Sequence, residues 1–212
     1  LRMRRQHNRA RFSSKRDRNQ AYALTEIQRL VAALGLAEMI SEQACALFES
    51  AQSNDLLTGR SLEGFAAASV YASCRVGSLA RTMDEIVTVA RAKKPELKTA
   101  YSAMNSELGL PVGPIDPTEY LPRYTSELDL AADVESRAHA YVDALRERNA
   151  VGGKHPSGVA AACLYKAAED FGAEITQTAV AGVGDVSPMT VRSTVDRLEE
   201  IGVVTGRWEA TS

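Results

Sequence analysis

The chain has 212 residues and a formal net charge of −2, with 45% hydrophobic and 6% aromatic residues. This length accommodates one large or two ordinary domains, and abundant alanine with few aromatic residues favours closely packed helices over a sheet sandwich. No apolar run approaches the roughly 20 residues of a membrane span, and no secretory signal is visible.

The charge is unevenly distributed along the chain. Residues 1–20 carry +7, so the remainder carries −9. Residues 1–15 are therefore interpreted as a basic arm on an acidic body, and any nucleic-acid contact is expected at local patches. A solvated, disordered tail is the alternative. Three widely spaced cysteines, Cys45, Cys74 and Cys163, predict buried thiols in a reducing compartment, without metal or haem spacing.

The first half of the chain predicts five helices. Three of them cover approximately residues 16–34, 37–53 and 61–76. The fourth opens at a capping box formed by Thr82 and Glu85, and the fifth runs from Pro95 to the stop at Gly109. The alanine run 66–68 permits close approach by neighbouring helices, so the third helix is expected to be central. The Pro-rich stretch 111–122 is the predicted linker.

After the linker the sequence repeats itself. Segments 59–71 and 153–165 align at an offset of 94 and are identical at six of 13 positions. The offset also places Thr82 on Thr176 and Leu97 on Val191, which indicates a true internal repeat. We therefore predict an all-α fold of two tandem five-helix domains at residues 16–110 and 115–207, each ending in a helix-turn-helix-like unit, with a tail at 208–212.

The second repeat ends in a segment, residues 176–201, that is predicted to form a helix, a tight turn and a second helix. Asp185 stands in the turn, because aspartate tolerates a left-handed conformation, and Ser187 and Pro188 begin the second helix. Three residues of that helix face inward: Val191, Val195 and Leu198. Four face outward from its first turns: Met189, Thr190, Arg192 and Ser193. This geometry is typical of a helix that enters a DNA major groove, although simple helical packing is an alternative.

These outward residues suit base edges, whereas their counterparts in the first repeat suit phosphates. Arg192 could reach guanine O6 and N7, with Met189 and Thr190 beside it. The first repeat instead presents three lysines, Lys93, Lys94 and Lys98, which favour contact with the DNA backbone. A solvated helix start is the alternative for these lysines.

Several stretches resemble the core of archaeal transcription factor B and eukaryotic TFIIB, a family with two tandem cyclin-like repeats. The resemblance covers essentially the whole chain and is closest to the archaeal members. It is carried by DLLTGRSLEGFAAASVYASCR, DPTEYLPRYTSELDL and AGVGDVSPMTVRSTVDRLEE.

The resemblance implies a general transcription initiation factor that binds the TATA-binding protein on promoter DNA, reads the upstream B-recognition element and positions RNA polymerase. Met189 and Arg192 match the family's base-reading positions, and Ser187 and Thr190 begin the same helix. The resemblance also implies contacts with the DNA backbone. Lys154 would make one in the second repeat, and four residues would make them in the first repeat: Arg60, Lys93, Lys94 and Lys98. A monomer in the cytoplasm of an archaeal cell, associated with the nucleoid and not with a membrane, is expected.

Three departures from the family pattern accompany the resemblance. No cysteine pair for the family's zinc ribbon exists, so no cofactor is predicted, and the sequence resembles the core of a longer protein with residues 1–15 ending the ribbon–core linker. Asp185 replaces a usual glycine. Ser193, Thr194 and Val195 stand where members often have Asn, Arg and Tyr, which bears on the strength or sequence of element recognition.

Other classes of function fit the sequence less well. An enzyme is disfavoured because His7, His139 and His155 lack a cysteine or carboxylate arranged as a nucleophile or metal partner, and no glycine loop has phosphate-cradling spacing. A cyclin-like protein-interaction module without DNA binding is the main competitor. A sequence-specific repressor is a third reading, although such proteins usually dimerise to read two half-sites.

Overall fold

The computed structural model describes residues 2–202, and only the backbone of residues 2–14. The chain divides into two compact units between Val112 and Gly113. The first unit contains α1 (Arg2–Ala33), α2 (Glu38–Ser53), α3 (Leu62–Val76), α4 (Met83–Val89) and α5 (Lys94–Leu108). The second contains a 3-10 turn η1 (Pro117–Tyr120), then α6 (Leu121–Glu127), α7 (Ala132–Glu147), α8 (Pro156–Asp170), α9 (Gln177–Val183) and α10 (Pro188–Glu200).

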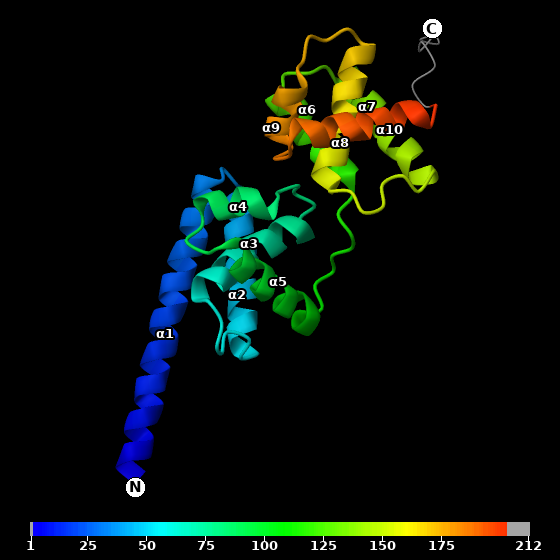
Figure 1. Ribbon diagram of the computed structural model, residues 1–212. Helices are drawn as coiled ribbons and strands as arrows, with labels where there is room; N and C mark the ends of the chain where they lie inside the picture. The colour runs from blue at the N-terminus through cyan, green and yellow to red at the C-terminus, as the bar shows by residue number, and fades with distance from the viewer. Residues whose placement is uncertain (1, 203–212) are drawn as a thin grey trace. The chain divides into compact units, whose positions relative to one another are not determined.

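Each unit is built around its alanine-rich third helix. In the first unit α3 packs against α1, α2, α4 and α5 (Figure 1). Every residue of α3 from Gly64 to Cys74 is buried. In the second unit α8 packs against η1, α6, α7, α9 and α10. No strand occurs within residues 2–202. The prediction of an all-α fold with two five-helix units around central alanine-rich helices is confirmed.

Local signals account for many of the helix boundaries. The Thr82 hydroxyl accepts a hydrogen bond from Glu85 N at 3.0 Å, and the Glu85 carboxylate accepts one from Thr82 N at 2.6 Å, so the predicted capping box opens α4. Gly109 ends α5 with a φ of 60°, a conformation that glycine adopts at little cost.

One boundary differs from the expected one, and a second falls where two predicted segments overlap. The sequence predicts a first helix from Arg16, but α1 is helical from Arg2, because residues 2–20 contain neither proline nor glycine to interrupt it. The end of the predicted linker, 111–122, overlaps the predicted second domain, and here Tyr120 and Leu121 are buried in the second unit. Pro117 and Pro122 resemble linker prolines, yet both occupy the first turn of a helix, where proline is tolerated. The predicted tail at 208–212 lies outside the described residues.

None of the helices within residues 2–202 combines the length and apolar character needed to cross a membrane.

Candidate nucleic-acid interface

The helix-turn-helix of the second unit has the turn conformation that its sequence predicts. Asp185 lies between α9 and α10 with a φ of 50°, in the left-handed region. The Ser187 hydroxyl accepts a hydrogen bond from Thr190 N at 3.2 Å and caps α10, and Pro188 follows in its first turn. The turn therefore sets the direction in which α10 leaves α9.

The inner face of α10 packs directly on α8, which it crosses (Figure 1). Val191, Val195 and Leu198 are buried, as predicted. A Cβ atom added at Gly158 of α8 would lie 3.0 Å from Thr190 Cγ2, so any larger residue at this crossing would push the threonine side chain aside by a few tenths of an ångström. Thr190 is half-buried at this contact, so it is less exposed than its outward-facing neighbours Met189 and Arg192.

The outer face of α10 presents three side chains near its N-terminus. Met189 is 70% exposed, the largest exposure among the large hydrophobic side chains of the described residues. Arg192 and Ser193 are also exposed, and Arg192 forms no ion pair within the described part of the chain. An exposed methionine beside an unpaired arginine at a helix N-terminus is suited to the floor of a major groove. The Ser187 hydroxyl, in contrast, caps the N-terminus of α10.

A second set of contacts ties the loop before α8 to this helix. Lys154 Nζ donates to Thr194 Oγ1 at 3.3 Å, and the buried Thr194 hydroxyl donates to the Thr190 carbonyl at 3.0 Å. Nearby, the buried Ser157 hydroxyl donates to the Gly184 carbonyl at 2.9 Å. Lys154 thus lies beside α10, with its remaining N–H donors available to a phosphate.

His155 completes the connection between this loop and the turn. Its Nδ1 lies 2.7 Å from Ser157 Oγ. Since the Ser157 hydrogen is donated to Gly184, the serine oxygen accepts here and His155 Nδ1 carries the proton. The loop, the turn and α10 are therefore held as one surface.

The corresponding surface of the first unit is basic. Lys93, Lys94 and Lys98 begin α5 and all are exposed. Lys94 Nζ lies 2.5 Å from Asp84 Oδ2, with both side chains about half exposed, so a solvent-screened carboxylate offsets part of its charge. Arg60 precedes α3, is exposed, and donates through Nη1 to the Leu56 carbonyl at 2.5 Å.

A polar cluster that was not predicted from the sequence anchors the turn between α4 and α5 of this unit. The Glu26 carboxylate is 2% exposed and accepts hydrogen bonds from Arg29 at 2.6 and 2.9 Å. Arg29 also donates to the Val89 carbonyl, the last residue of α4, at 2.7 Å. Arg91 lies 3.6 Å from Glu26 and donates to Tyr22 Oη at 3.1 Å. Hydrogen bonding from Arg29 holds the Glu26 pKa below its usual value, although burial opposes this effect.

The burial of the cysteines agrees only partly with the prediction that all three are buried. Cys74 and Cys163 are buried, but Cys45 is only half-buried. Burial raises the pKa of Cys74 to about 11, so its thiol stays protonated at neutral pH. Among the side chains that the structure describes, no group of three or more His, Cys, Asp or Glu could hold a metal ion.

Comparison with known proteins shows which family the chain is similar to. A family model described as "Transcription factor TFIIB repeat" matches the chain twice, over residues 16–107 and 112–201. Transcription initiation factor IIB 1 of Halobacterium salinarum is 53% identical over 199 residues, covering 94% of this chain and 69% of that protein. Factor IIB 5 of the same organism is 42% identical over 94% of this chain and 65% of its own length. Transcription initiation factor IIB of Archaeoglobus fulgidus is 38% identical, covering 96% of this chain and 63% of that protein.

Proposed function

Because the chain belongs to the TFIIB family of transcription factors, we propose that it acts as the core of a general transcription initiation factor. In this role it binds the complex of TATA-binding protein and promoter DNA, reads the upstream B-recognition element, and helps to position RNA polymerase. The chain spans between 63% and 69% of the length of the three relatives from Halobacterium salinarum and Archaeoglobus fulgidus. The activity of a whole initiation factor is therefore part of the proposal.

One observation carries the assignment of element reading to the second unit. Met189 and Arg192 project from the first turns of α10, and the Lys154 ammonium lies next to the same helix. A major-groove helix needs such side chains for base edges and a flanking cation for the phosphates. The first unit, with Lys93 and Lys98 exposed at its equivalent helix, is assigned to the DNA backbone.

A gel-shift on a TATA-containing promoter fragment tests this proposal. The chain is added with the TATA-binding protein present, with it absent, and with it present on DNA whose upstream element is scrambled. We expect a supershift that requires both the partner and the intact element. A supershift indifferent to the element would contradict base reading.

A cyclin-like interaction module without DNA binding is the competing function. It would retain the buried alanine-rich α3 and α8 but has no use for Met189 exposed at 70% beside Arg192. Absence of a supershift at every salt concentration would favour this module, and a protein partner would then be sought.

A further inference from the structure

Exposed apolar side chains gather at one end of the first unit. Five large hydrophobic side chains are exposed among the described residues, and Met189 already belongs to the face of α10 assigned to DNA. Three of the other four come from neighbouring elements of the first unit: Met39 is 61% exposed, Val76 41% and Leu79 39%. Single exposed apolar residues are ordinary on protein surfaces, whereas a group of them marks an interaction site.

Contacts within the first unit bring these three residues to the same end. Met39 lies in the first turn of α2, and Val76 is the last residue of α3. A Cβ atom added at Gly77, directly after α3, would lie 3.7 Å from Ile40 Cδ1, so the start of α2 meets the end of α3. Leu79 N donates at 2.8 Å to a carbonyl in the last turn of α3, which turns the chain back over that end. Met39, Val76 and Leu79 therefore form an apolar patch at one end of the unit.

The second unit shows that the fold does not require an apolar patch here. At the offset of 94 between the repeats, its equivalents of the three patch residues are acidic or small: Asp133, Asp170 and Ala173. The backbones correspond, because Ala173 N donates to the Ala168 carbonyl at 2.9 Å, which is the counterpart of the bond made by Leu79 N. Packing of the repeat is satisfied without exposed apolar groups at these positions, so packing does not account for the patch.

The exposed charges around the patch are negative. Glu38 and Glu42 flank it on α2, both are exposed, and neither forms an ion pair within the described part of the chain. The cations close by in the sequence are less available, because Arg75 is half-buried and the Arg81 guanidinium lies 3.5 Å from Glu85. At an interface, charge at the rim selects the partner while the apolar centre is desolvated. An apolar patch with a negative rim therefore matches a partner that combines apolar and basic side chains.

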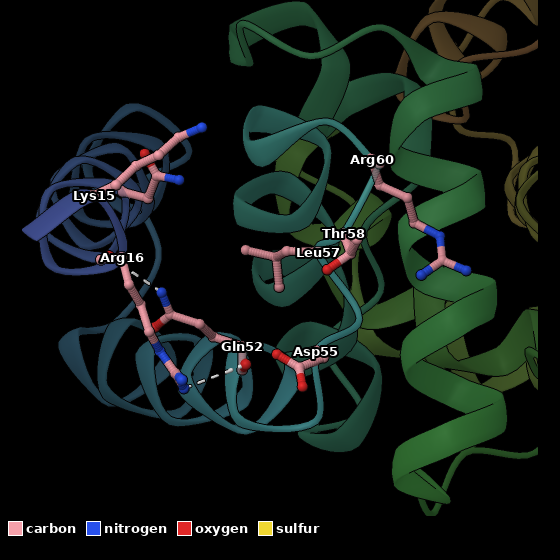
Figure 2. A pocket seen from close by; sticks show the side chains of 9 residues that line it. Lys15, Arg16, Gln52, Asp55, Leu57, Thr58 and Arg60 are labelled. Atoms are coloured by element: carbon pink, nitrogen blue, oxygen red, sulfur yellow. Dashed lines mark hydrogen bonds between the residues drawn. The ribbon is translucent and has the colours of Figure 1, made fainter. Parts of the chain in front are cut away.

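This end of the unit is separate from the surfaces assigned to DNA. The loop that joins α2 to α3 lies at the other end of both helices, where Arg16 and Arg60 line a pocket of about 820 Å³ (Figure 2). The lysines that begin α5 also lie toward that other end, because a Cβ atom added at Gly64, near the start of α3, would lie 3.0 Å from the Glu96 carbonyl oxygen. A negative rim repels phosphate, so the apolar patch is not part of the DNA path.

We propose that the apolar patch is a docking site for a basic amphipathic helix of a partner protein. The apolar face of that helix covers Met39, Val76 and Leu79, and its flanking lysine or arginine side chains pair with Glu38 and Glu42. Residues 2–202 contain no strand edge that an extended segment could join, so a helix laid on the patch is the mode of peptide recognition that this surface offers. The docking site adds a protein contact to the proposed function and does not depend on it.

A double variant that borrows residues of the second unit tests the site on the full chain. Met39→Asp with Leu79→Ala places at the patch the residues that the second unit carries at the same positions. Aspartate in the first turn of a helix is favourable, so the fold is retained, which urea titration checks. Phe171→Ala, at an exposed apolar position of the second unit, is the matched control.

Two synthetic helical peptides serve as probes, with the same leucine face and with either lysine or glutamate on the remaining positions. We expect the lysine peptide to shift the ¹⁵N–¹H signals of Met39, Val76 and Leu79, and the glutamate peptide to leave them unchanged. The double variant should weaken binding of the lysine peptide by about tenfold, and Phe171→Ala should not change it. Glu42→Lys, at an exposed position, should weaken the lysine peptide and allow the glutamate peptide to bind.

Three results would overturn the docking site. Equal binding of the two peptides, or no shift with either, contradicts a basic partner. Patch signals that move with the concentration of the chain alone indicate a second copy as the occupant. A weaker supershift with the double variant than with wild type places the patch in the promoter complex instead. The supershift of the wild-type chain tests the proposed function separately, so failure of one is distinguishable from failure of the other.

Discussion

Lys154 Nζ lies 3.3 Å from Thr194 Oγ1, and this contact joins the loop before α8 to the middle of α10. Thr194 is 1% exposed, and its hydroxyl both accepts from Lys154 and donates to the Thr190 carbonyl. Family members often carry arginine at the position of Thr194, but the side chain at this position is buried here. The exposed side chains near the N-terminus of α10 are therefore Met189, Arg192 and Ser193, and Lys154 lies beside them.

Thr194→Val tests whether this contact places Lys154. The substitution keeps the shape but removes a buried hydroxyl, so we expect the free energy of unfolding to fall by about 1 kcal/mol in urea titrations. Lys154 would lose its anchor, and affinity for the partner–promoter complex should fall equally on intact and scrambled elements. Ser136→Ala is the matched control, since Ser136 also donates to a carbonyl of its own helix, that of Ala132 at 3.1 Å, but lies on the exposed face of α7, away from α10. Equal reductions of DNA affinity in the two variants would contradict the anchoring role.

Arg192→Ala tests base reading. We expect a loss of about 1–3 kcal/mol on the intact promoter and a relaxed preference at one upstream base pair, measured by gel-shift across single-base variants. Arg197→Ala is the control on the same helix, because Arg197 is exposed but paired with Glu200 at 2.8 Å. Should Arg192→Ala weaken intact and scrambled elements by the same factor, Arg192 contacts phosphate and not a base.

The lysines at the start of α5 should differ in their contribution to DNA binding. Replacing Lys93 and Lys98 together by alanine should weaken all duplexes alike and flatten the salt dependence by about one unit for each phosphate that is no longer neutralised. Lys94→Ala should have a smaller effect, because Asp84 lies 2.5 Å from Lys94 Nζ. Asp84→Asn should release Lys94 and steepen the salt dependence. An unchanged slope in the Lys93 and Lys98 double variant would show that these lysines are only solvated.

The features that could be predicted from the sequence are those set by local conformation or by periodicity. Asp185 in the left-handed region and the Ser187 cap follow from side-chain preferences at single positions, and Val191 and Leu198 follow from helical spacing. The internal repeat then extends the fold from one half of the chain to the other. Such signals involve residues close together in the sequence, so no tertiary knowledge is needed.

The features that could not be predicted depend on contacts between distant segments. Periodicity places Thr190 on the outer face, but Gly158, on a different helix, allows α10 to approach until the threonine is half-buried. In the sequence, Glu26 is one charge among many on α1. Its burial depends on Arg29 and on Arg91, which belongs to the turn between α4 and α5. A pairing across about 65 residues has no signature in composition or spacing.

The Glu26 cluster predicts an acid-sensitive contribution to stability. Arg29 lowers the pKa of Glu26 in the folded chain, so the ionised carboxylate stabilises the fold above the unfolded pKa of about 4.3, and this contribution is lost as the pH falls through the folded pKa. Glu26→Gln should reduce the free energy of unfolding by about 2 kcal/mol at pH 7, because a charge-assisted hydrogen bond to a buried group is removed.

The same variant separates this carboxylate from the general acid sensitivity of the chain. In urea titrations between pH 7 and pH 2.5, the stability difference between wild type and Glu26→Gln should begin to shrink as the pH falls below the unfolded pKa of about 4.3. It should vanish once the pH has passed below the lower folded pKa of Glu26, where the carboxyl is protonated in both states. Glu42→Gln, at an exposed position of α2, controls for removal of a surface carboxylate. If the difference between Glu26→Gln and wild type stays constant down to pH 2.5, the loss comes from packing of the side chain. The ion pair with Arg29 would then not be what secures the turn that carries Arg91.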